Sequence, residues 1–281
     1  MHAKKLLLVL GLSVIMALAV FPGAARSEMY VEGYLGGNFA GSADMDRFFW
    51  HDGGGFNPLG YTETHHIPGR IDPAVVGGLK LGTWFVKEGF LGFNYPDWAK
   101  HLGFYVDFSY HRLDFRRIRM GSFATGIGQS IIPTYTPNNF WSEGTAATLA
   151  FMFAARYGFL PDSEVPFGRL QPYLALGPAI LFSSQEPGLT SGFIIAGAPA
   201  FVGYTINPGS ASAVNIALAV EAGLRWMALK NVSLDASFKY RYAQPSYQYS
   251  YNDPVDFLPR SFTLNLTYHL FSFQMGAAYH F

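Results

Sequence analysis

Hydrophobic and polar residues alternate at every second position along most of this chain. In the segment 232–242, Val, Leu, Ala, Phe and Tyr occupy the even positions, and Ser, Asp, Lys and Arg occupy the odd ones. The segment 102–111 alternates in the same way. A helix would scatter these apolar residues around its circumference, whereas a strand places them all on one face. The pattern therefore predicts an all-β protein.

Eight segments pass this test, and the connections between them alternate in length. The segments are 29–39, 74–86, 101–117, 144–158, 168–182, 212–228, 231–243 and 262–281. The first, third, fifth and seventh connections are long, and the sixth is a tight turn. The second, 87–100, lies on the side of the short turns and is longer than expected there. Long outer loops and short periplasmic turns are typical of outer-membrane barrels. We predict an up-and-down antiparallel transmembrane β-barrel of eight strands, with both ends of the mature chain on the periplasmic side.

Three local features modify this prediction. The apolar positions of the last segment change from even to odd near residue 270, which predicts a bulge there. Pro172 and Pro178 lie inside the fifth segment, and because each lacks an N–H, local bulges are expected. The stretch 193–206 is apolar enough to form its own hairpin, and if it enters the membrane the barrel has ten strands.

The composition agrees with a membrane barrel. The chain is 50% hydrophobic and only 14% charged, whereas soluble domains carry about 25% charged residues. The richest late stretch, 213–229, is interrupted by Asn215, Glu221 and Arg225, so no spanning helix is predicted there. The absence of cysteine excludes disulfides and thiolate metal sites. A net charge of zero gives no indication of a nucleic-acid partner.

The first residues have the pattern of a targeting segment. Lys4 and Lys5 precede an apolar run that ends at Phe21, and small residues follow. This predicts a signal peptide over 1–27, cleaved after Ala25 or Ser27, and a barrel domain over 28–281. An N-terminal membrane anchor is the alternative.

The predicted strand faces assign the charged residues to the interior. If the apolar face meets lipid, the polar face must point into a narrow barrel that has room only for side chains. The inward charges are then Glu32, Lys80, Asp107, Arg156, Glu221, Arg225, Asp235, Lys239 and Arg241. Because buried charges require partners, this near-balanced set predicts a closed, salt-bridged core. A polar lumen that conducts ions is the alternative.

Aromatic residues near the predicted strand ends suggest two belts at the membrane interfaces. The group at the periplasmic strand ends comprises Trp84, Phe85, Tyr157, Phe159, Trp226, Tyr279 and Phe281. The group near the outer strand ends comprises Tyr110, Phe115, Trp141, Phe182, Tyr240 and Phe262.

Four motifs carry a family resemblance: YVEGYLGG at 30–37, GGLKLG at 77–82, LQPYLALG at 170–177 and GAAYHF at 276–281. The chain resembles the small, porin-like outer-membrane β-barrels related to the transmembrane domain of outer membrane protein A. The resemblance implies residence in the outer membrane of a Gram-negative bacterium, among its lipids. It also implies that the barrel-assembly machinery reads the last strand through Phe273, Met275, Tyr279 and Phe281. In contrast to that protein, no peptidoglycan-binding domain is expected after the barrel.

Candidate catalytic and metal sites are weak. Ser109 and His111, with Asp107 or Asp114, have the residue types of a nucleophile, base and acid. Their surroundings do not match the His-Ser setting of lipid A deacylase barrels, so we predict polar residues that line the lumen. The first long loop holds Glu63, His65 and His66, and also Asp44, Asp46 and Asp52 near Gly53–Gly55. Neither set has the ligand number or spacing of a metal site, so no metal or cofactor is expected.

The sequence favours a non-enzymatic barrel that is structural or exposed at the cell surface. Its long connections are rich in aromatic residues: Phe48, Phe49, Trp50, Phe56, Phe140, Trp141, Tyr247, Tyr249 and Tyr251. These residues either form a surface for an extracellular ligand or pack on one another. A small-solute pore and a lipid-modifying enzyme are the alternatives, and a soluble lipocalin-like carrier is the least favoured.

Overall fold

The computed structural model describes residues 28–51, 61–86, 95–120, 124–126, 138–194, 201–252, 257 and 259–281. The predicted signal peptide, 1–27, lies outside these residues, so its prediction stays untested. Within the described ranges, no helix has the length and apolar character required to cross a bilayer.

Within the described residues, thirteen strands form a single sheet. They are β1 (Glu28–His51), β2 (Tyr61–Arg70), β3 (Ala74–Trp84), β4 (Leu102–Arg112), β5 (Phe115–Met120), β6 (Ala124–Gly126), β7 (Asn138–Arg156), β8 (Leu170–Ile194), β9 (Phe201–Ile206), β10 (Ala211–Leu229), β11 (Val232–Ala243), β12 (Ser246–Asn252) and β13 (Pro259–His280). A short 3-10 helix, η2 (Asp97–His101), precedes β4.

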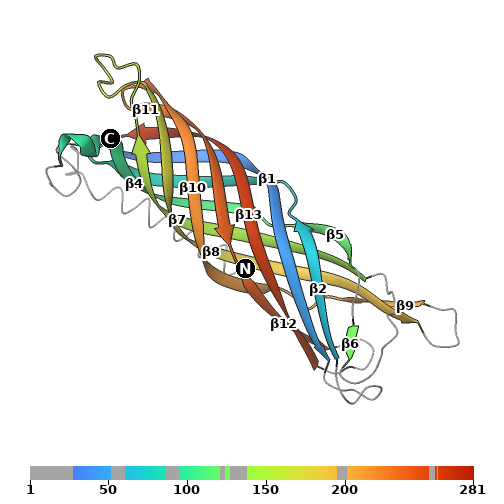
Figure 1. Cartoon of the computed structure of the whole chain (residues 1–281). Helices are drawn as coiled ribbons and strands as arrows, with labels where there is room; N and C mark the ends of the chain where they lie inside the picture. The colour runs from blue at the N-terminus through green and yellow to red at the C-terminus, as the bar shows by residue number, and fades with distance from the viewer. Residues whose placement is uncertain are drawn as a thin grey trace.

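Eight of these strands close into a ring in the order β1, β3, β4, β7, β8, β10, β11 and β13 (Figure 1). Every pair is antiparallel, and β13 pairs back onto β1 with Tyr30 opposite His280. Each ring strand therefore has two neighbours for its backbone groups, as a structure surrounded by lipid requires. The predicted eight-stranded antiparallel barrel is confirmed.

The other five strands extend the wall at one end of the ring. Along β1, β2 continues the line of β3, and along β7, β5 continues the line of β4. Along β13, β12 continues the line of β11, and along β8, β9 continues the line of β10. We call this the loop end, and the opposite end, which holds Glu28 and Phe281, the turn end (Figure 1). Much of the chain predicted as long loops is thus strand.

The length of the strands shows that the wall reaches beyond a bilayer. β1 has 24 residues and β8 has 25, whereas about 9–11 residues cross the membrane. The end of β8 pairs with β9, with Ile194 opposite Phe201, as expected for a hairpin, but in the described chain β9 pairs only with β8 beyond the ring. The ten-strand alternative is therefore wrong.

The predicted bulge in the last strand is also wrong. β13 keeps one register against both β11 and β12, and from Phe262 to His280 its even residues other than Gly276 are buried. The irregularity lies in β1, whose register against β13 shifts between Phe39 and Ser42. The direction of the side chains is constant along β13, and it is their chemistry that changes.

This change divides the barrel into two halves near Leu270. Towards the turn end, Phe273, Met275 and Tyr279 of β13 are exposed on the outside, while Ser272 and Gln274 are buried inside. Towards the loop end the inside is largely apolar, with the buried side chains Ile71, Leu113, Phe115, Phe140, Leu189, Tyr247, Tyr249, Phe262, Leu264, Leu266, Tyr268 and Leu270. An apolar outer face suits lipid, and an apolar core within a polar wall suits water. The boundary of the hydrocarbon therefore lies near Leu270.

The aromatic belts need a matching correction. Trp226, Tyr279, Phe281 and Phe182 are exposed as predicted. Trp84, Phe115 and Phe262 are buried in the interior, so their assignment to the belts is wrong.

The two prolines of β8 do not produce the expected bulges. Pro172 lies opposite Leu224 and Pro178 opposite Leu218, and the register of β8 against β10 has no shift. The register against β7 is the same on both sides of a short break between Ala179 and Leu176. The missing proline N–H interrupts the ladder at that point without adding a residue.

Glycines opposite inward aromatic rings make the turn-end half compact. Gly223 lies opposite Tyr173, and a Cβ atom at Gly223 would lie 2.4 Å from the tyrosine ring. Tyr30 and Trp84 cover Gly82 and Gly103 in the same way. The ring can lie flat on the wall only because these positions have no side chain.

We expect Gly223→Ala to lower the free energy of unfolding by about 1–3 kcal/mol, because the new methyl group overlaps Tyr173. Gly37→Ala is the matched control, since a Cβ atom at Gly37 meets nothing within 4 Å. Urea unfolding of the protein in lipid vesicles measures both changes. Equal losses in the two variants would contradict the packing argument.

The position of the boundary can be tested with tryptophan. Phe273→Trp should be strongly quenched by lipids brominated on their acyl chains, because residue 273 faces outward in the turn-end half. Asn265→Trp, which also faces outward, lies in the loop-end half and should escape this quenching. Equal quenching at the two positions would show that the boundary is misplaced.

Candidate functional site

Seven of the predicted inward charges meet in one network inside the turn-end half. Strand alternation brings them from β1, β3, β4, β10 and β11, and each is at most 4% exposed: Glu32, Lys80, Asp107, Glu221, Arg225, Asp235 and Lys239. The residues are distant in sequence and meet only because the ring closes.

Lys80 lies at the centre of this network. Its Nζ atom is 2.8 Å from Glu32 Oε1, 2.7 Å from Glu221 Oε1 and 3.9 Å from Asp235 Oδ1. It also lies 5.1 Å from the ring centroid of Tyr34. A single ammonium group thus neutralises parts of three carboxylates from three strands.

Two further cations complete the network. Arg225 Nη2 lies 2.7 Å from Glu32 Oε2, and its Nε lies 3.3 Å from Asp235 Oδ2. Lys239 Nζ lies 2.9 Å from Glu221 Oε2 and also forms an ion pair with Asp107. Because every carboxylate has a cationic partner, the network is a closed electrostatic unit.

Tyrosines that the sequence analysis did not assign to the site hold these carboxylates. Tyr34 donates to Asp107 Oδ1 at 2.6 Å, and Tyr105 donates to Glu221 Oε2 at 3.0 Å. The Tyr173 hydroxyl lies 2.7 Å from Glu221 Oε1 and 2.8 Å from Asp235 Oδ1, so its one hydrogen is shared between the two carboxylates. The period-two pattern places these rings inward, so alternation was the signal that could have found them.

Arg241 and Arg156 do not join the network. Arg241 donates to Ser109 Oγ at 3.4 Å and to Ser272 Oγ at 3.2 Å. Arg156 forms an ion pair with Glu28 and donates to Gln171 Oε1 at 2.9 Å.

The Arg156 guanidinium lies between two aromatic rings at the turn end. The Arg156 Cζ atom lies 4.1 Å from the Trp84 ring centroid and 4.2 Å from the Phe167 ring centroid. A buried cation between two aromatic faces is stabilised by cation–π attraction as well as by packing.

The interior of the loop-end half is filled by residues that were predicted as loop aromatics. Tyr247 donates to Ser183 Oγ at 2.6 Å, and Tyr249 donates to the Gln185 carbonyl at 3.0 Å. Burial raises the pKa of both phenols, so both stay neutral donors. Phe140 is completely buried as well. The interpretation of these three residues as an exposed binding surface is wrong, because strands continue where loops were expected.

The catalytic candidates from the sequence are occupied elsewhere. His111 Nδ1 lies 3.0 Å from the carbonyl oxygen of Arg112, and Ser109 accepts the bond from Arg241. A second pair, Ser233 Oγ and His280 Nε2, lies 2.8 Å apart at the turn end. Ser233 has no exposed surface, so a substrate has no approach to its hydroxyl.

The metal candidates lie in strands and not in an open loop. Glu63, His65 and His66 belong to β2, and Asp44 and Asp46 belong to β1, but their side chains lie outside the described part of the structure. Asp52 and Gly53–Gly55 lie wholly outside it. In the part that is described, no three His, Cys, Asp or Glu residues gather into a metal-binding group.

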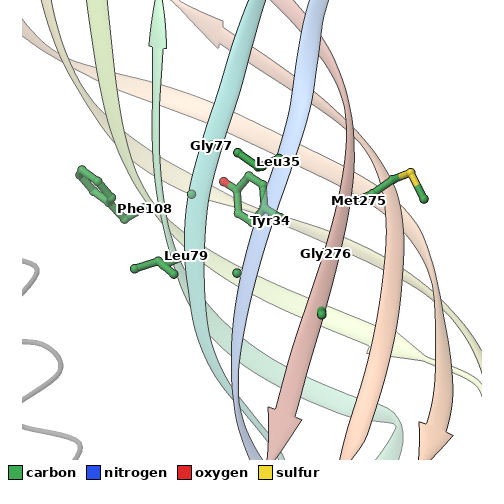
Figure 2. A pocket seen from close by; sticks show the side chains of 10 residues that line it. Tyr34, Leu35, Gly77, Leu79, Phe108, Met275 and Gly276 are labelled. Carbon is green, nitrogen blue, oxygen red and sulfur yellow. The ribbon is translucent and has the colours of Figure 1, made fainter.

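A shallow groove of about 670 Å³ opens on the outer face of β13, β1 and β3 (Figure 2). Gly33, Gly77 and Ala277 leave it hollow, and Leu35 and Met275 line it. The groove lies within the apolar belt, so it belongs to the surface that meets lipid.

Lys80→Met should destabilise the barrel by about 3–5 kcal/mol, because three buried carboxylates lose their shared cation. Arg112→Met is the control: its ion pair with Asp114 is exposed at the surface, and such a pair contributes about 0–1 kcal/mol. Urea unfolding in vesicles gives both values. A loss for Lys80→Met no larger than for the control would show that the network contributes little to folding.

Comparisons with known proteins found only remote similarity. No family model and no curated protein matches the chain. Outer membrane protein OprG from Pseudomonas aeruginosa is 13% identical over 91% of this chain and 96% of its own, with a TM-score of 0.47. A major outer membrane protein from Thermus thermophilus is 12% identical over 91% and 100%, with a TM-score of 0.42. Neisserial surface protein A is 14% identical over 90% and 97%, with a TM-score of 0.26.

The closed antiparallel ring and its apolar outer face are the features by which such barrels are recognised. The chain has the fold of the small outer-membrane β-barrels, the class that its sequence resembles.

Proposed function

We propose that this protein is a closed, non-enzymatic barrel of the bacterial outer membrane, whose loop-end half projects from the cell and contacts an external partner. The observation that carries the proposal is the filling of the lumen at three levels. Arg156 and Trp84 fill the turn end, the network around Lys80 fills the middle, and the apolar core of Tyr268 and its neighbours fills the loop end.

The ion-conducting alternative requires this filling to be removed. An eight-stranded barrel has room inside for little more than its own side chains. An ion that entered would have to separate pairs such as Lys80 and Glu221, which are 2.7 Å apart and fully buried. Beyond them it would have to break the hydrogen bonds that join Tyr247, Ser183 and Gln185 in a largely apolar core.

The absence of catalysis is part of the proposal. Support comes from the serines paired with a histidine in sequence or in space: Ser109 and Ser233 are each at most 1% exposed. The lipid-modifying alternative predicts that the mass of lipid A changes when the protein is expressed.

The proposal includes the route by which the protein reaches the outer membrane. Residues 1–27 act as the signal peptide, and the barrel-assembly machinery reads the last strand. The support is that Phe273, Met275, Tyr279 and Phe281 are all exposed on the outer face, where a protein outside the barrel can reach them.

Purified protein in planar bilayers should show no stable channels, because the lumen is filled. The same preparation should run faster than boiled protein on a detergent gel, which establishes that the barrel is folded and resists detergent. Stable, sizeable conductance from folded protein would overturn the closed-barrel proposal in favour of the pore.

A further inference from the structure

The wall of the loop-end half is open along one line. In the described chain, β9 pairs only with β8, and β12 pairs only with β13. β9 and β12 continue the lines of β10 and β11, which begin to pair with each other at Ala217 and Ala243. Among the described residues, 211–216 of β10 form a ladder with β8 but no ladder with β12, although the two strands approach each other at the base of the opening. We call this opening, between 201–216 and β12, the seam.

The seam is closed at its base and hollow at its mouth. At the base, the Asn215 Nδ2 atom donates to the Gln244 carbonyl oxygen at 3.3 Å. The mouth is a hollow of about 330 Å³ lined by Thr205, Ile206, Asn207 and Pro208 on one side and by Ser250, Tyr251 and Asn252 on the other. Its volume is within the range of ligand sites, and no residue of its lining is charged.

The pairing of β12 determines which of its backbone groups face the seam. The Leu266 N–H donates to the Pro245 carbonyl at 2.9 Å, and antiparallel ladders alternate between bonded and non-bonded pairs. Tyr247, Tyr249 and Tyr251 therefore bond to β13. The backbone groups of Ser246, Gln248, Ser250 and Asn252 point into the seam. Asn252 faces Pro259, which has no N–H to offer it, in agreement with this assignment.

Neither edge carries the usual protection against another strand. Free edges in natural proteins are commonly guarded by lysine, proline or a bulge. β12 has the sequence SYQYSYN and β9 the sequence FVGYTI, and neither contains a charge or a proline. Nothing in these two sequences repels a second main chain.

We propose that the seam is an acceptor for an extended, uncharged peptide segment of an external protein, which adds a strand to β12. The free groups are main-chain donors and acceptors at a two-residue repeat, and another polypeptide main chain complements that repeat. The inference rests on the proposed function, because it names the kind of partner that the loop-end half contacts.

The probe is a synthetic, end-capped peptide of alternating threonine and valine, added to the folded full-length protein in detergent. We expect saturable binding that is lost when alternate peptide nitrogens are methylated, since methylation removes the N–H donors and keeps the side chains. Gln248→Pro should weaken binding about tenfold, because it removes an N–H that faces the seam without touching the bonds to β13. Gln248→Ala keeps that N–H and should bind as the parent does.

Each other result counts against the proposal. Equal binding of the methylated peptide would show that side chains alone are recognised, and no binding would overturn strand addition outright. If the protein self-associates without peptide and Gln248→Pro abolishes that, the occupant is a second copy of the chain. Conductance measured on the same preparation distinguishes failure of this inference from failure of the proposed function. A barrel that does not conduct and does not bind the peptide refutes strand addition at the seam but leaves the closed-barrel proposal intact.

Discussion

Hydrocarbon on the outside of the turn-end half is the constraint from which the rest of this structure follows. It requires apolar side chains outward, which sends every polar side chain of the alternating pattern into a narrow interior. Charges enclosed there must be paired, and Lys80 at 2.7–2.8 Å from Glu221 and Glu32 is the result. Where the hydrocarbon ends, the requirement reverses. The strands continue without changing their direction, and the interior becomes the apolar core around Leu264 and Tyr268.

Much of this was predictable from the sequence, because alternation with a period of two survives in any strand. It was sufficient to identify the ring strands and the side chains that meet around Lys80. It failed at Leu270 because the pattern records the contrast between two faces and does not say which face is outside. A reversal of environment and an inserted residue leave the same trace in β13. Only the pairing, which shows one unbroken register from Ser246 to Val232, separates them.

Alternation places the rings of Tyr34, Tyr105 and Tyr173 inward, but the carboxylates that they bind could not be predicted from the sequence. Tyr34, Tyr105 and Tyr173 are aromatic, and aromatic residues in a membrane barrel suggest the interfacial belts first. Their role depends on carboxylates that are distant in the sequence: Glu221 lies 48 residues from Tyr173 and 116 residues from Tyr105. Long-range contacts of this kind can be predicted only when the register of every intervening strand pair is known. Glycines at 82, 103 and 223 belong to the same problem, since each is explained by a ring on the next strand.

The two halves of the wall also place different demands on an unpaired strand edge. Within the hydrocarbon, an open edge would leave N–H and C=O groups without partners, so β10 and β11 pair throughout their shared length below Ala217 and Ala243. Above the boundary, water satisfies the same groups, and the seam between β9 and β12 carries little cost. An edge that is tolerated in water remains a template for another strand. The reversal at Leu270 that gives the loop-end half its own apolar core therefore also permits its wall to open.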